Sequence, residues 1–152
     1  MAAARIMIVE ARYYAHISDE LMKGALAALA EAGASHERVG VPGAFEIPAA
    51  IRFAVEGERR GNQRARFDGY VALGCVIRGE TTHYDYVCTE SARGLQELAL
   101  QHNIAIGFGI LTVENEAQAL ARASVSRKNK GGEAARACLA MIALKRSFGL
   151  AP

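Results

Sequence analysis

Apolar residues along the chain follow two alternating patterns. Four short runs rich in apolar residues predict β-strands, at residues 5–10, 37–41, 70–77 and 104–113. The stretches between and after them place apolar residues every three or four positions, as amphipathic helices do. These helices are predicted to begin near residues 18, 47, 84, 114 and 133.

Local signals refine two of these segments. Ser18 is predicted to cap the first helix, since Asp19 and Glu20 follow it, and Gly33 is predicted to end that helix. The segment 56–66 is polar and punctuated by glycine, which predicts a solvated loop. A nucleic-acid-binding patch is the alternative interpretation of its arginines.

The alternation of strands and helices predicts the fold class. Strand–helix–strand units with right-handed crossovers build a mainly parallel sheet with helices on both faces. The chain is therefore expected to be an α/β protein, a three-layer αβα sandwich of the flavodoxin-like kind with a four-stranded parallel sheet. Its 152 residues contain no repeat, so we expect a single domain over residues 1–152.

Composition narrows the function classes. A hydrophobic share of 51% argues against disorder, and no apolar run has the length of a membrane span. A net charge of +2 favours neither nucleic acid nor a membrane surface as a partner. The three cysteines, at 75, 88 and 138, form no CxxC pair and are expected to be reduced thiols rather than metal ligands. Without a signal-peptide pattern at the N-terminus, a cytoplasmic protein is expected.

Candidate chemistry lies after the predicted strands, because parallel sheets bind ligands at the carboxyl ends of their strands. Gly79, Thr81 and Thr82 precede a predicted helix, where backbone N–H groups and hydroxyls can bind an anion. His83 would stand beside that anion and could transfer a proton near neutral pH. The alternative is that a threonine caps the helix and His83 bonds to a loop.

Other candidates are weaker from the residues alone. Tyr13 and Phe45 are loop aromatics that could stack on a planar ligand or pack on their own domain. Glu46 could accept hydrogen bonds from a polyol or cap a helix. Arg122 could clamp a phosphate, or belong to a solvated helix end. The chain has no GxGxxG, GxxxxGK[ST] or GxSxG motif, which argues against dinucleotide, NTP and serine-hydrolase sites.

Four motifs in order give a specific resemblance, at residues 41–48 (VPGAFEIP), 73–87 (LGCVIRGETTHYDYV), 108–112 (FGILT) and 129–131 (NKG). With them the chain resembles the 6,7-dimethyl-8-ribityllumazine synthase family over residues 5–148. The resemblance implies a transferase of riboflavin biosynthesis that uses no metal or organic cofactor. It would condense 5-amino-6-(D-ribitylamino)uracil with 3,4-dihydroxy-2-butanone 4-phosphate, releasing phosphate and water.

The resemblance also implies roles for individual residues, with His83 as the proton-transfer residue. The pyrimidine substrate would be bound by Tyr13, Ala44, Phe45, Glu46, Cys75, Val76, Ile77 and Phe108. The phosphate substrate would be bound by Glu80, Thr81, Arg122 and Lys130. Phe108 and Lys130 are expected to come from a neighbouring subunit, in a homo-oligomer that is a pentamer in this family.

Two positions depart from the common pattern of the family. Tyr14 stands where a small polar residue is frequent, and Glu80 places an acid beside the expected phosphate. A non-catalytic paralogue that binds a flavin or lumazine is the alternative function. His83 and Arg122 distinguish the two, because a pure binding protein needs neither a proton shuttle nor a phosphate clamp.

Overall fold

Four parallel strands form one sheet in the order β2-β1-β3-β4. They are β1 (Arg5–Ala11), β2 (Ser35–Val41), β3 (Gly69–Ile77) and β4 (Ala105–Val113), in a computed structural model that describes residues 2–150. Every pairing between neighbouring strands is parallel. The predicted parallel sheet is therefore confirmed.

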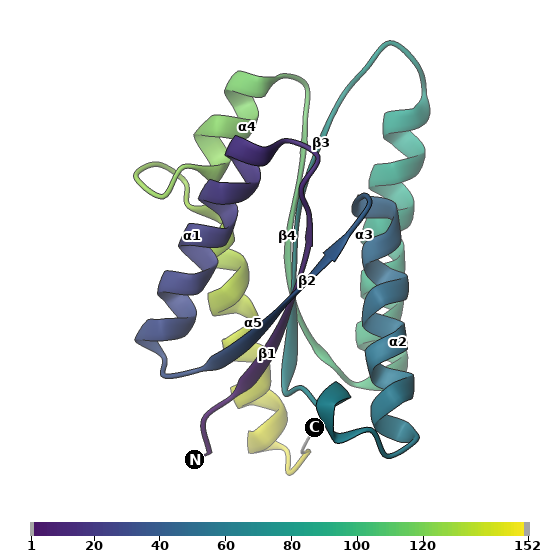
Figure 1. Ribbon diagram of the computed structural model, residues 1–152, viewed down its shortest axis with the longest axis vertical. Helices are drawn as coiled ribbons and strands as arrows, with labels where there is room; N and C mark the ends of the chain where they lie inside the picture. Colours follow the sequence, from purple (N-terminus) through teal and green to yellow (C-terminus); the bar gives the residue numbers. More distant parts are fainter. Residues whose placement is uncertain (1, 151–152) are drawn as a thin grey trace.

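Helices cover both faces of this sheet (Figure 1). They are α1 (Ala15–Glu31), α2 (Ile47–Arg59), α3 (His83–His102), α4 (Glu116–Ala123) and α5 (Lys130–Ser147), with short 3-10 turns η1 (Ala44–Glu46) and η2 (Gln63–Ala65). Helices α1, α4 and α5 lie on one face, and α2 and α3 lie on the other (Figure 1). This is the three-layer α/β sandwich that the sequence predicted. None of the described helices is long and apolar enough to cross a membrane.

Alternate residues of the central strands belong to two separate cores. From β1, Ile6 and Ile8 pack into the core beneath α1, α4 and α5, whereas Met7 and Val9 pack into the core beneath α2 and α3. Because successive side chains of a strand point to opposite faces, both cores draw on β1 and β3. That double burial explains why β3 is wholly apolar and why the centre of β1, residues 6–9, is apolar too.

The first helix begins earlier than the sequence predicted, so the expected Ser18 cap is wrong. Helix α1 begins at Ala15, and its N-cap residue Tyr14 forms no side-chain cap hydrogen bond. Ser18 is buried and its hydroxyl donates to the carbonyl of Ala11 at 3.5 Å. A local pattern cannot separate a capping serine from one that bonds to a neighbouring strand.

The polar segment 56–66 is only partly a loop. Helix α2 continues to Arg59, and η2 follows. Glu56 accepts hydrogen bonds from Arg52, Arg59 and Arg60, and these arginines hold the pKa of its carboxyl well below the usual range. Pairs three and four residues apart support a helix, which explains the extension.

The last helix also begins earlier than predicted, at Lys130 rather than Glu133. Its N-cap residue Asn129 has a positive φ of 47°, and the Asn129 side chain accepts a hydrogen bond from the N–H of Gly132 at 3.2 Å. Gly131 lies against the backbone of α1, where an added Cβ would stand 2.0 Å from the carbonyl oxygen of Leu21. In the sequence, the adjacent Gly131 and Gly132 suggest a break before the helix. The structure shows instead that close packing between α1 and α5 requires Gly131.

We expect Gly131→Ala to destabilise the protein by about 2–3 kcal/mol, because the atom that the new methyl group meets is backbone and cannot move aside. Denaturant unfolding monitored by circular dichroism measures the change. Gly40→Ala is the matched control, since within residues 2–150 no atom other than those of its two chain neighbours lies within 4 Å of its added Cβ. Equal stability of the two variants would contradict the close approach of α1 and α5.

Candidate active site

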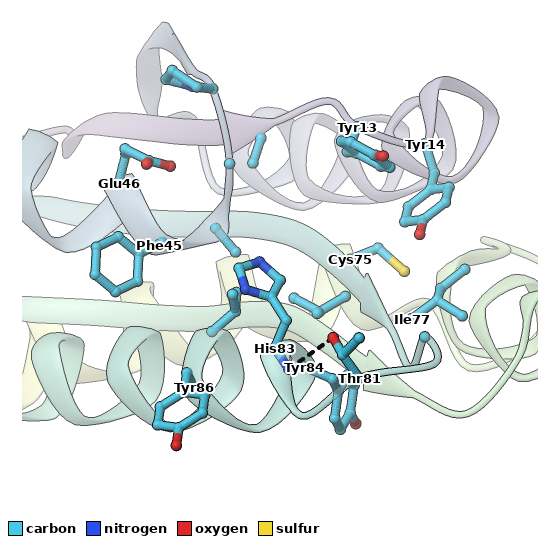
Figure 2. A pocket seen from close by; sticks show the side chains of 17 residues that line it. Tyr13, Tyr14, Phe45, Glu46, Cys75, Ile77, Thr81, His83, Tyr84 and Tyr86 are labelled. Atoms are coloured by element: carbon cyan, nitrogen blue, oxygen red, sulfur yellow. Dashed lines mark hydrogen bonds between the residues drawn. The ribbon is translucent and has the colours of Figure 1, made fainter.

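An open cavity of about 640 Å³ lies at the carboxyl ends of β1, β2 and β3, where these strands lead into α1, η1 and α3. Figure 2 shows its lining side chains. Among them are most of the residues predicted from the sequence: Tyr13, Ala44, Phe45, Glu46, Cys75, Val76, Ile77, Thr81 and His83. Three loops far apart in the sequence therefore meet in one cavity.

Two tyrosines follow β1 and form one wall of the cavity. Their ring centroids lie 4.9 Å apart and the ring planes meet at 72°, an edge-to-face contact. Tyr14 is half-buried against the core, and this burial raises the pKa of its hydroxyl. The Tyr13 ring is 78% exposed at the cavity mouth, where a planar ligand can reach its face.

The turn η1 supplies an aromatic ring and a carboxylate. Ala44 is buried, which anchors the turn, while Phe45 remains 56% exposed. Glu46 occupies the N-cap position of α2, but its side chain forms no cap hydrogen bond. The carboxylate is thus available to a ligand, and the helix-capping interpretation of Glu46 is wrong.

The loop after β3 leads into the first turn of α3. Thr81 Oγ1 accepts a hydrogen bond from the N–H of His83 at 3.3 Å, so this threonine does hold the start of the helix. The imidazole of His83 points away from α3 into the cavity, as Figure 2 shows. Thr81 therefore takes the structural role that the sequence left open, and the His83 ring remains exposed to a ligand.

Arg78 ties this loop to the next strand connection. Its Nε donates to Glu114 at 2.8 Å, and its guanidinium lies 3.5 Å from Asp85 and 4.4 Å from the centre of the Tyr84 ring. The sequence pattern did not predict these contacts of Arg78. The only local sign of these contacts in the sequence is the position of Arg78, a cation directly after a buried strand.

Tyr84, Tyr86 and Val87 also line the cavity and were not predicted as site residues. They belong to the first two turns of α3, together with His83. Residues three and four positions apart share one face of a helix, so the spacing of 83, 86 and 87 was the signal that could have identified two of them.

Four predicted residues do not line this cavity. Glu80 is exposed in the loop after β3, and Phe108 is 51% exposed on the edge strand β4. Arg122 lies on α4 and donates to the carbonyl of Gln118 at 3.0 Å. Lys130 begins α5 and pairs with Glu133 at 3.0 Å. Within one chain, then, the two cations lie outside the cavity that contains His83.

Comparison with known proteins identifies the family. A family model described as 6,7-dimethyl-8-ribityllumazine synthase matches residues 3–146. The chain is 58% identical to the 6,7-dimethyl-8-ribityllumazine synthase of Sphingopyxis alaskensis over 147 residues, which cover 97% of this chain and 99% of the relative. The chain belongs to the 6,7-dimethyl-8-ribityllumazine synthase family.

Other relatives give the same result. The enzyme of this name from Agrobacterium fabrum is 53% identical over 149 residues, covering 98% of this chain and 99% of the relative. That from Paramagnetospirillum magneticum is 52% identical over 147 residues, covering 97% and 98%. The similarity to lumazine synthases thus extends over nearly the full length of both chains.

The cysteine in the cavity of this lumazine synthase family member is poorly suited to nucleophilic attack. Burial raises the pKa of the Cys75 thiol to about 11, so the thiolate is scarce at neutral pH. Within residues 2–150, no group of three His, Cys, Asp or Glu side chains is arranged to hold a metal ion. The described cavity therefore provides an imidazole, a carboxylate and aromatic rings as its chemical groups.

We expect Cys75 in the folded protein to react with iodoacetamide at pH 8 about 100-fold more slowly than a free thiol. Peptide mass spectrometry at timed intervals measures the rate, and the denatured protein serves as control. Because folding raises this pKa, the protonated thiol stabilises the fold at neutral pH, and that contribution is lost as the pH rises towards 11. Labelling of the folded protein at the free-thiol rate would contradict the burial of Cys75.

Proposed function

We propose that this protein catalyses the condensation of 5-amino-6-(D-ribitylamino)uracil with 3,4-dihydroxy-2-butanone 4-phosphate to give 6,7-dimethyl-8-ribityllumazine, phosphate and water. Its membership of the lumazine synthase family supports this reaction. The observation that carries the proposal is the meeting of Tyr13, Glu46 and His83 in one cavity, since these groups suit an aromatic ring, a polyol and a proton transfer.

The reaction itself needs little covalent chemistry from the protein. The 5-amino group of the pyrimidine attacks the ketone, and the carbinolamine loses water to form an imine. The carbon next to the imine then loses a proton and phosphate leaves from the terminal carbon, and the remaining enol tautomerises to a second carbonyl. The ribitylamino nitrogen closes the ring on that carbonyl with loss of a second water. Since the nucleophile belongs to the substrate, the protein must orient two ligands, stabilise an anion and carry protons.

The lining residues can divide these tasks. Tyr13 stacks on the pyrimidine, Phe45 packs beside it, and Glu46 accepts hydrogen bonds from ribityl hydroxyls. The backbone of residues 75–77, at the end of β3, bonds to the polar edge of the ring, with Ala44 beneath. The loop of Glu80 and Thr81 holds the phosphate by its backbone, next to the N-terminus of α3.

His83 is the proposed proton carrier, because its ring is the imidazole that projects into the cavity. We expect His83→Ala to lower kcat by up to about 100-fold while changing KM for either substrate much less. Stopped-flow absorbance of the lumazine product measures both constants. His83→Gln is a useful control, because it keeps a polar side chain without a titratable ring. An unchanged kcat in His83→Ala would remove His83 from the mechanism.

The cavity of one chain lacks the cations expected to bind phosphate, and we infer that a second copy of the chain supplies them. Arg122, Lys130 and Phe108 lie on α4, α5 and β4, away from the cavity of their own chain. A head-to-tail contact would bring them to the cavity of a neighbour, and such contacts form a ring when the rotation between neighbouring subunits closes. We propose the pentameric ring of this family as that assembly.

Arg122→Ala should chiefly weaken use of the butanone phosphate. Loss of a charge-assisted hydrogen bond to phosphate costs about 1.5–3 kcal/mol, or one to two decades in kcat/KM for that substrate. Arg122→Lys should recover only part of this, because an ammonium lacks the planar fork of donors. If the KM for the pyrimidine alone rises, the phosphate role of Arg122 is wrong.

Mixed oligomers test the shared site directly. His83→Ala and Arg122→Ala chains carrying different tags are co-expressed, and oligomers with both tags are purified. If the two residues of one site come from neighbouring chains, about a quarter of the sites in a random 1:1 mixture are intact. Activity well above that of either parent variant is therefore expected. Activity no higher than the parents would place both residues in one chain.

The binding-protein alternative is tested with the unmodified chain. Purified protein is mixed with both substrates, and lumazine absorbance is compared with the uncatalysed rate. A rate above background supports the enzyme. Tight binding of lumazine or riboflavin without any acceleration would support the non-catalytic paralogue.

A further inference from the structure

The loop that presents Tyr13 is held by tertiary contacts rather than by a helix cap. Strand β1 ends at Ala11 and α1 begins at Ala15, so residues 12–14 are the whole connection. The N-cap residue of α1, Tyr14, makes no side-chain cap hydrogen bond. A helix start without a cap leaves the connection dependent on contacts from elsewhere.

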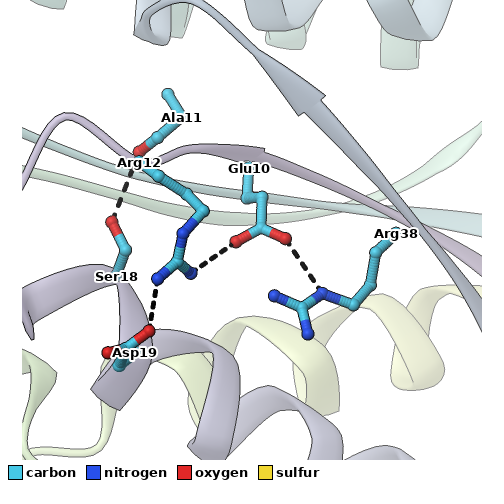
Figure 3. Close-up of polar contacts among 6 residues, drawn as sticks. All are labelled: Glu10, Ala11, Arg12, Ser18, Asp19 and Arg38. Carbon is cyan, nitrogen blue, oxygen red and sulfur yellow. Dashed lines mark hydrogen bonds and ion pairs between the residues drawn. The ribbon is translucent and has the colours of Figure 1, made fainter. Parts of the chain in front are cut away.

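A buried carboxylate provides those contacts. Glu10, the penultimate residue of β1, is only 5% exposed. One carboxylate oxygen accepts from Arg12 at 2.9 Å and the other accepts from Arg38 of β2, also at 2.9 Å (Figure 3). Arg12 donates in addition to Asp19 of α1. The chain Arg38–Glu10–Arg12–Asp19 therefore connects β2, β1, the loop and α1.

Stability alone does not explain a charge at this position. The preceding residues Ile8 and Val9 are fully buried and apolar, as expected in a central strand. A carboxylate among them loses its hydration, and a buried ion pair is on average no better for stability than a well-packed apolar residue. Glu10 instead fixes the position and orientation of the Arg12 guanidinium.

The direction of Arg12 matters because Tyr13 follows it. The Tyr13 ring is 78% exposed, and its ring contact is the edge-to-face contact with Tyr14. The position of this ring is thus set mainly by the backbone of residues 12–14. Stacking depends on the position and tilt of the ring, so a shifted backbone weakens the contact with a planar ligand.

We propose that Glu10 is a positioning residue for the pyrimidine substrate, acting through Arg12 to fix the loop that presents Tyr13 and Tyr14. The role in substrate binding rests on the proposed function. Glu10 itself touches no substrate, because its carboxylate is enclosed by the two arginines on the α1 face of the sheet.

Glu10→Gln tests the proposal with almost no change of shape. The amide oxygen can accept from one arginine only, and the amide nitrogen repels the other. We expect the KM for the pyrimidine to rise about tenfold, as for the loss of one hydrogen bond to a charged group. The kcat and the KM for the butanone phosphate should stay within about twofold, since the role is confined to one ligand.

A double-mutant cycle locates the effect. Arg12→Ala should raise the KM for the pyrimidine as much as Glu10→Gln does, and Glu10→Gln should add nothing in the Arg12→Ala background. Asp19 lies at the surface, so Asp19→Asn cannot disturb the core and provides a variant that folds. We expect it to raise the KM for the pyrimidine less, by about threefold. Additive effects of Glu10→Gln and Arg12→Ala would overturn the proposal.

Arg38→Gln is the matched control for a merely structural role. It removes the other partner of Glu10 but leaves the contact with Arg12. We expect its melting temperature to fall by an amount similar to that of Glu10→Gln, while the KM for the pyrimidine stays within about twofold. An equal rise in KM for Arg38→Gln would show that general loosening of β1 and β2, not the placement of Tyr13, changes binding.

Hydrogen exchange separates this proposal from the assignment of the reaction. The N–H of Ser18, which donates to the carbonyl of Tyr14 at 2.9 Å, reports on the loop without any substrate. Exchange in a peptide covering residues 11–19 should be faster in Glu10→Gln than in the unmodified protein and unchanged in Arg38→Gln. Unchanged exchange in Glu10→Gln would overturn the positioning role. Absence of lumazine formation by the unmodified protein would instead overturn the proposed reaction.

Discussion

Burial of β1 and β3 on both faces is the constraint on which the rest of the structure depends. β3 is wholly apolar and β1 is apolar except for Arg5 and Glu10, so each strand needs a helical layer on either side. Parallel strands joined through these helices have their carboxyl ends at one edge of the sheet. The loops at 12–14, 42–46 and 78–82 therefore meet there, although more than sixty residues separate the first from the last.

The helical layer of α1, α4 and α5 imposes a second requirement. Helix α5 approaches α1 closely enough that Gly131 has no room for a Cβ, and Asn129 takes a left-handed conformation to begin that helix. Lys130 stands between these two positions, and Arg122 lies on α4 in the same layer. The packing that stabilises this face also determines where Lys130 and Arg122 lie.

The sequence predicted what depends on burial and missed what depends on single tertiary contacts. The strands and the helix layers follow from apolar patterning, and those predictions are confirmed. The predicted starts of α1 and α5 were wrong, because Ser18 bonds to a strand and Gly131 packs on a neighbouring helix. The strand ends read from the chain located Tyr13, Phe45, Glu46, Thr81 and His83 as candidates, and the family resemblance added Ala44 and residues 75–77. The contacts of Glu10 were not predicted, because a carboxylate at the end of a strand gives no sign in the sequence that it is buried.

Chemistry explains why a contact such as that of Glu10 can matter here. In the proposed reaction the substrate brings its own nucleophile, and the buried thiol of Cys75 is kept protonated. The protein then accelerates the reaction mainly by orienting two ligands, an effect that is lost when a ring or loop shifts by about an ångström. A side chain that fixes the loop of Tyr13 therefore contributes to kcat/KM for the pyrimidine, as a side chain that touches this ligand does. The buried charge in β1, unfavourable for the strand alone, follows from that demand on orientation.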